Sequence, residues 1–204
     1  MLNNLVPDNW TKAAYPCLKR LASWVKDLHA RLRFMREWLL NGQPSAFWIS
    51  GFVFPQGFLT GALQNYARKY AIAIDTLNFS FSVLAPDGPE GLAGDGSDVP
   101  KDGVLVYGCF FDGARWDRER KCVTDSRPSE INSPMPIMHF MPFRDYKPNP
   151  KEYSTPMYKT SKRAGVLSTT GMSTNYVISV ELRTEKPPET WTQAGAALLC
   201  MLDD

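Results

Sequence analysis

Apolar residues recur every three or four positions between residues 17 and 40. We call them the apolar seam; its members are Leu18, Leu21, Val25, Leu28, Leu32, Met35 and Leu39. This spacing places the side chains on one face of an α-helix, so it predicts a long amphipathic helix over residues 17–40. Asn41-Gly42, with Pro44 just beyond, is typical of the end of a helix.

The apolar seam has two interpretations. It could be a coiled-coil interface, or it could be the side of the helix that packs on the domain's own core. The second is favoured because the seam covers only three heptads and most amphipathic faces are buried within their own domain. Basic residues off the seam then form a predicted outer face: Lys19, Arg20, Lys26, Arg31, Arg33 and Arg36.

A second apolar stretch, residues 47–70, has a broken pattern. Its first ten residues, FWISGFVFPQ, are mostly large and apolar but contain Gly51 and Pro55. From Gln56 onward the apolar residues return to helical spacing. The stretch therefore predicts a short buried segment, a turn, and a helix over residues 56–70.

The remaining sequence favours β-structure. Residues 79–83 alternate apolar and hydroxyl side chains, as a half-buried strand does, and they close a first part, residues 1–84. Residues 85–103 are rich in Gly, Pro and Asp and predict a flexible loop. Residues 104–204 contain short apolar runs between turns; the predicted strands are 104–111, 121–124, 136–141, 154–160, 176–182 and 196–202. Such strands predict an antiparallel sandwich or a partly closed barrel, and hence an α+β fold.

Composition and charge exclude several classes of protein. The 204 residues include 23 basic and 21 acidic ones, a net charge of +2 that gives no support for binding nucleic acid. No apolar run reaches the ~20 residues that cross a membrane, and no secretory signal opens the sequence. The four cysteines have no metal-ligand spacing.

The densest polar cluster is the turn around Asp112, Arg115 and Asp117. Paired carboxylates and guanidiniums could bind an anion or transfer protons, which makes a small β-barrel enzyme or anion-binding module the alternative function. A charged β-hairpin turn explains the cluster as well and is favoured, because Asp112-Gly113 is a hairpin signal. We find no phosphate-loop, nucleophile-elbow or zinc-protease motif, so no catalytic, cofactor-binding or metal-ligating residue is predicted.

Two further segments carry polar groups that could bind a partner. The small-residue loop 168–174 predicts a hydrogen-bonded turn, although its amides could form an anion nest. Just before it, Lys159, Lys162 and Arg163 form a basic rim that is either solvated surface or a docking patch.

Several motifs, in order along the sequence, resemble the C-terminal domain of dynein heavy chains, especially the axonemal inner-arm type. They are AYPCLK at 14–19, the 47–70 stretch, GCFFDGARWD at 108–117, residues 156–175 and residues 191–200. Met172 stands where the family usually has His, which weakens any role for a histidine in that loop.

The resemblance implies N-terminal α-helices followed by an incomplete antiparallel β-barrel. It implies a regulatory and structural module that packs on the AAA+ ring of its own heavy chain and binds no ATP itself. The parent chain would use ATP and Mg in its AAA+ modules for minus-end-directed movement along microtubules in cilia or flagella, with intermediate and light chains as partners. The candidate ring-docking residues are Arg31, Arg36, Lys159, Lys162 and Arg163.

Overall fold

The computed structural model describes residues 4–92, 99–164 and 174–203, and it has the predicted α+β class. The α-helices are α1 (Asp8–Ala13), α2 (Leu21–Asn41), α3 (Pro55–Tyr70) and α4 (Pro188–Gln193). The 3-10 helices are η1 (Ile49–Gly51), η2 (Ile74–Thr76) and η3 (Pro89–Gly91). The strands are β1 (Phe47–Trp48), β2 (Leu77–Val83), β3 (Val104–Tyr107), β4 (Phe110–Asp112), β5 (Arg115–Asp117), β6 (Cys122–Thr124), β7 (Asn132–Pro134), β8 (Met138–Arg144), β9 (Glu152–Tyr158), β10 (Tyr176–Arg183) and β11 (Ala197–Leu199).

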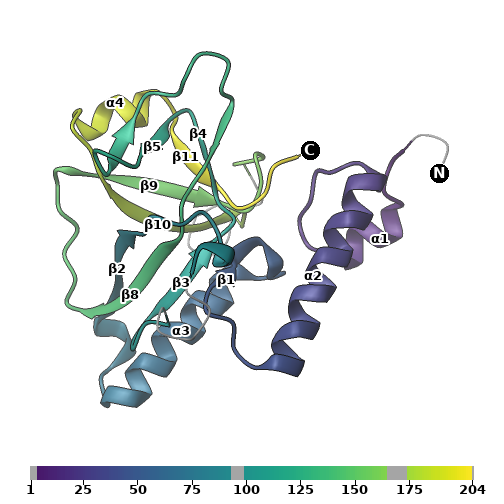
Figure 1. Cartoon of the computed structure of the whole chain (residues 1–204), viewed down its shortest axis with the longest axis horizontal. Coiled ribbons are helices and arrows are strands. Elements are labelled where there is room, and N and C mark those ends of the chain that lie inside the picture. Colours follow the sequence, from purple (N-terminus) through teal and green to yellow (C-terminus); the bar gives the residue numbers. More distant parts are fainter. Residues whose placement is uncertain (1–3, 93–98, 165–173, 204) are drawn as a thin grey trace.

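The strands form two larger sheets and one short hairpin. The first sheet has the order β1-β3-β8-β2, the second has the order β10-β9-β11-β4-β7, and β5 pairs with β6. The sheets surround a shared core without closing into one ring, which confirms the incomplete barrel (Figure 1). The pairing is not wholly antiparallel as predicted, because β1 runs parallel to β3 and β11 runs parallel to β9.

The predicted strand 104–111 is divided in two at Gly108. β3, before it, belongs to the first sheet, and β4, after it, belongs to the second. Gly108 has a φ of +85°, and a Cβ there would lie 2.5 Å from Cδ1 of Trp48. Only glycine combines this backbone conformation with such a close approach, so Gly108 is where the polypeptide passes from one sheet to the other.

Both parts of the sequence contribute to one core. β1 and β2 come from residues 1–84, whereas their partners β3 and β8 follow residue 103. The largest fully buried side chains are Trp191, Phe79, Phe111, Phe140, Ile49, Met135, Ile137, Met138, Met157, Leu182, Leu198 and Leu199. Burying each of them contributes ~1.5–3 kcal/mol of transfer free energy, so this core is the main source of stability.

The predicted loop 85–103 is attached to the domain at both described ends. The backbone amide of Ile137 donates to Pro86 O at 2.8 Å. On the other side, Asp102 accepts from Nζ of Lys69 at 2.6 Å, and its carbonyl lies 2.9 Å from Nε2 of His139. Residues 93–98, the centre of the predicted loop, lie outside the described residues.

Helix α2 differs most from expectation. It begins at Leu21 rather than residue 17, and the six-residue helix α1 precedes it. Its buried residues are Trp24 and Arg31, and Phe34 and Trp38 pack against the core. The prediction that the apolar seam is the core side is wrong: Leu32 is 59% exposed and Leu39 is 86% exposed. In Figure 1, α1 and α2 stand to one side of the strands.

Candidate functional site

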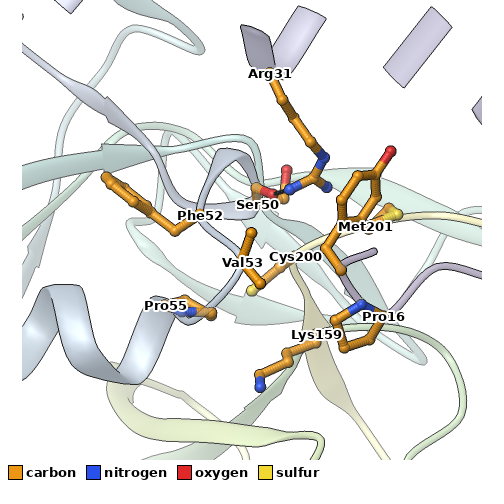
Figure 2. Close-up of a pocket in the computed structure, with 10 residues that line it drawn as sticks. Pro16, Arg31, Ser50, Phe52, Val53, Pro55, Lys159, Cys200 and Met201 are labelled. Carbon is orange, nitrogen blue, oxygen red and sulfur yellow. Dashed lines mark hydrogen bonds between the residues drawn. The ribbon is translucent and has the colours of Figure 1, made fainter. Parts of the chain in front are cut away.

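Arg31 joins helix α2 to the rest of the domain. Its guanidinium donates from Nε to Asp27 at 2.6 Å and from Nη1 to the carbonyl oxygen of Ser50 in η1. The guanidinium carbon lies 3.5 Å from the centroid of the Tyr15 ring and 5.4 Å from that of Trp48. Figure 2 shows the guanidinium pointing toward Ser50 across a small pocket. Cation–π stacking and charge-assisted hydrogen bonds therefore hold the middle of α2 in place.

The position of Arg31 corrects its predicted exposure. The residue is 4% exposed, whereas the sequence pattern predicts it on an outer basic face of the helix. The error arises because Trp24, Arg31 and Trp38 recur at seven-residue intervals and form a second stripe beside the apolar seam. Arg31 can be inside because Asp27 neutralises it and aromatic rings cover it. It is a structural anchor and cannot be an exposed docking contact.

The basic rim divides into internal and exposed residues. Lys159 is half-buried, and burial lowers its pKa; its Nζ lies 5.4 Å from the centroid of the Phe54 ring. Arg163 donates to Asp112 at 2.6 Å and to Gly195 O at 2.5 Å. Lys162, by contrast, is exposed, as is Arg36 on α2. Arg36 and Lys162 therefore remain as the exposed cations of the predicted docking set.

The charged turn does not assemble as a reactive site. Asp112 pairs with Arg163 rather than Arg115, which itself lies 3.7 Å from Asp117. Asp117 accepts hydrogen bonds from the amides of Arg120 and Glu119 at 3.0 Å, and these bonds hold its pKa below the usual range. This carboxylate is thus ionised and occupied in closing the β5–β6 turn, so it is poorly suited to deliver a proton.

The larger cavities have open, mixed linings. One of ≈ 350 Å³ lies between the N-terminal segment and the basic rim; its lining includes Tyr15, Pro16, Cys17, Thr160, Lys162 and Asn175. Another of ≈ 320 Å³ lies beside the β5–β6 turn and is lined by Arg115, Trp116, Asp117, Arg118, Glu119 and Arg127. Within the described residues no group of three or more His, Cys, Asp or Glu side chains could hold a metal ion. The predicted loop 168–174 lies outside the described residues except for Thr174.

No helix among the described residues is both long and apolar enough to cross a membrane.

The apolar seam on α2 forms a distinctive surface. Leu21, Val25, Leu28 and Met35 are half-buried, and Leu18, Leu32 and Leu39 are exposed. The sequence revealed these residues but not their exposure; the neighbouring aromatic stripe of Trp24, Phe34 and Trp38 was the signal that another face turns inward.

Comparison with known proteins identifies the family to which the sequence belongs. Residues 1–200 match the family described as the C-terminal domain of the dynein heavy chain. The sequence is 46% identical to human dynein axonemal heavy chain 6 over 218 residues, and 48% identical to rat dynein axonemal heavy chain 1 over 204 residues. Each alignment covers 100% of this protein but only 5% and 4% of those relatives, respectively. The protein therefore belongs to the family of C-terminal domains of dynein heavy chains, with axonemal dynein heavy chains among its relatives.

Proposed function

We propose that this protein is a non-catalytic module of an axonemal dynein heavy chain, one that packs on the AAA+ modules of its own chain and modulates motor output. The observation that carries the proposal is the family match over residues 1–200 together with relatives about 46–48% identical along the full sequence. The heavy chain, using ATP and Mg in its AAA+ modules, moves toward microtubule minus ends in cilia or flagella. Intermediate and light chains are its further partners.

The contacts of the polar residues support a non-catalytic role. Arg31, Asp112 and Arg163 fasten elements of the domain to one another, and Asp117 closes a turn. Groups engaged in this way stabilise a rigid body, which is what a module bracing a larger assembly needs. The exposed apolar seam and the exposed cations Arg36 and Lys162 supply the surface for that assembly.

The proposal is tested on the heavy chain with and without residues 1–204. We expect the shortened polypeptide to keep ATP hydrolysis but to show altered microtubule gliding and altered stimulation of hydrolysis by microtubules. Photolabelling of the full heavy chain with an azido-ATP should modify peptides outside residues 1–204. Labelled peptides within this domain, or gliding and hydrolysis that are unchanged by its removal, would contradict the proposal.

A further inference from the structure

We propose that the apolar seam of α2 binds an amphipathic helix from the part of the same heavy chain that precedes this domain. The inference rests on the proposed function and names the surface through which the domain attaches. Helix α2 has one face turned inward and a second apolar face that the described residues cover only in part.

The geometry of α2 separates these two faces. Consecutive helical residues are about 100° apart, so the seam is centred about a quarter turn from the face that carries Trp24, Arg31 and Trp38. The inward face is covered: Trp24 stacks on Trp10 and Tyr15, with centroids 5.6 and 6.2 Å apart, and Trp38 lies 5.2 Å from Phe47. Among the described residues the seam has no such cover at Leu32 and Leu39. A contiguous apolar stripe of this kind marks an interaction surface.

The spacing of the seam indicates a helical occupant. From Leu21 to Leu39 its members step by four, three, four, three and four residues. This is the repeat with which one helix packs its side chains between those of another. The interpretation of the seam as an interface between helices, set aside on sequence grounds, therefore agrees better with the structure.

The extent of the relatives identifies where the occupant comes from. The matched region is 4–6% of the relatives' length, and the family is the C-terminal domain of such proteins. In a protein built in this way nearly all of the remaining polypeptide precedes the domain, and it enters beside α1 and α2 (Figure 1). The uncovered seam thus lies at the end of the domain that the preceding polypeptide reaches first.

The charges beside the seam favour this occupant over a second copy of the domain. Arg36 is exposed and lies about 60° around the helix from the centre of the seam, and it forms no ion pair with another of the described residues. Two copies packed seam to seam would offer Arg36 no carboxylate partner, because the positions of α2 that flank the seam hold no Asp or Glu. The occupant we expect has an apolar stripe flanked by Asp or Glu.

The test measures maleimide labelling of single cysteines placed in the full heavy chain. Leu32→Cys and Leu39→Cys report on the seam. Phe143→Cys and Ile131→Cys are matched controls, because the native residues are 53% and 79% exposed, against 59% and 86% for Leu32 and Leu39. We expect labelling about ten-fold slower at 32 and 39 than at 131 and 143, since a covered thiol reacts only when the contact opens.

A second substitution separates packing on the seam from other causes of protection. Leu32→Glu combined with Leu39→Cys should restore fast labelling at position 39, because a carboxylate would then face an apolar, acid-flanked partner. Protection that persists in this variant, or that disappears on dilution as a contact between two copies would, overturns the inference.

The outcomes also distinguish this inference from the proposed function. If labelling at positions 32 and 39 is fast but removal of residues 1–204 still alters gliding, the seam is not the contact and the proposed function stands. Fast labelling with unaltered gliding removes both.

Discussion

The guanidinium carbon of Arg31 lies 3.5 Å above the centre of the Tyr15 ring, and this stacked pair joins α2 to the segment before it. Arg31 also reaches Asp27 and the carbonyl oxygen of Ser50, so this one residue links the N-terminal segment, α2 and η1. Among the described residues, the other main contacts of α2 with the core come from the aromatic group around Phe34 and Trp38. The stability of the domain should therefore be sensitive to this residue.

Replacing Arg31 by methionine should lower the free energy of unfolding of the 204-residue protein by about 3 kcal/mol or more. The substitution leaves the Asp27 carboxylate buried without its partner, and breaking such a pair is costly. Arg36→Met is the matched control on the same helix; it is exposed and should change stability by about 0.5 kcal/mol or less. Urea unfolding of both variants provides the measurement, and equal losses would contradict the anchoring role.

Tyr15 should make stability depend on alkaline pH. Burial, followed by the nearby Asp27 carboxylate, raises the pKa of Tyr15 well above its usual range. The unfolded protein releases this proton near pH ~10 while the folded protein still holds it, so stability is complete below that pH and falls above it. Tyr15→Phe should make the fall shallower by up to about 1.4 kcal/mol per pH unit. If the free energy of unfolding falls equally steeply above pH ~10 in the native protein and in the Tyr15→Phe variant, the linkage is refuted.

Two glycines should respond to alanine in opposite directions. Gly103 has a φ of +81°, and a Cβ there would lie 2.3 Å from the backbone oxygen of Phe140. Gly103→Ala should therefore destabilise the domain by about 2 kcal/mol or more. Gly61 lies within α3 with nothing within 4 Å of an added Cβ among the described residues, so Gly61→Ala should stabilise it by about 0.5–1 kcal/mol. Thermal unfolding checks both, and a shift of the same sign in the two variants would be inconsistent with the local geometry.

A double-mutant cycle should distinguish the partner of Asp112. The structure pairs it with Arg163 at 2.6 Å, and both side chains are about one-third exposed. We expect a coupling free energy of about 0.5–1 kcal/mol between Asp112→Asn and Arg163→Met. The cycle with Arg115→Met should give a coupling near zero. A larger coupling to Arg115 would restore the charged turn as a candidate anion site.

Local signals in the sequence were sufficient for much of the fold. The broken pattern around Gly51 and Pro55 correctly predicted the helix α3, because backbone punctuation and helical spacing are both short-range. The short buried segment predicted before it contains the strand β1 and the 3-10 helix η1, which the pattern did not specify. The alternation at residues 79–83 likewise identified β2. Such local signals did not predict the parallel pairing of β1 with β3 and of β9 with β11, because these pairings join segments far apart in the sequence.

Helix α2 shows why the candidate surface was harder to predict. Its two stripes have nearly the same spacing, and the one with more aliphatic residues was taken as the core side. The structure buries the aromatic stripe instead, because Tyr15, Phe47 and Phe52 supply rings that pack against it. The prediction that Arg31 is exposed failed for the same reason. Its burial depends on contacts with Tyr15 and Ser50, and helical periodicity alone does not predict those contacts.

The exposed cations should strengthen attachment of the domain to the rest of its heavy chain. Arg36 and Lys162 are exposed, whereas Arg31 is buried and Arg163 is engaged with Asp112. Arg36→Glu and Lys162→Glu should each weaken docking by about 1 kcal/mol or less, because charges at the rim of an interface are screened by water and salt. Neither should unfold the domain.

Hydrogen exchange of residues 1–204 within the full heavy chain, at low and high salt, measures this effect. Docked amides should exchange faster in the double charge-reversal variant, and the difference from the native protein should shrink at high salt. Lys147→Glu is the control, because Lys147 is exposed in the segment between β8 and β9, away from α2 and the basic rim. If the double variant exchanges like the native protein at low salt, these two cations do not contribute to docking, and the apolar seam would have to hold the domain without them.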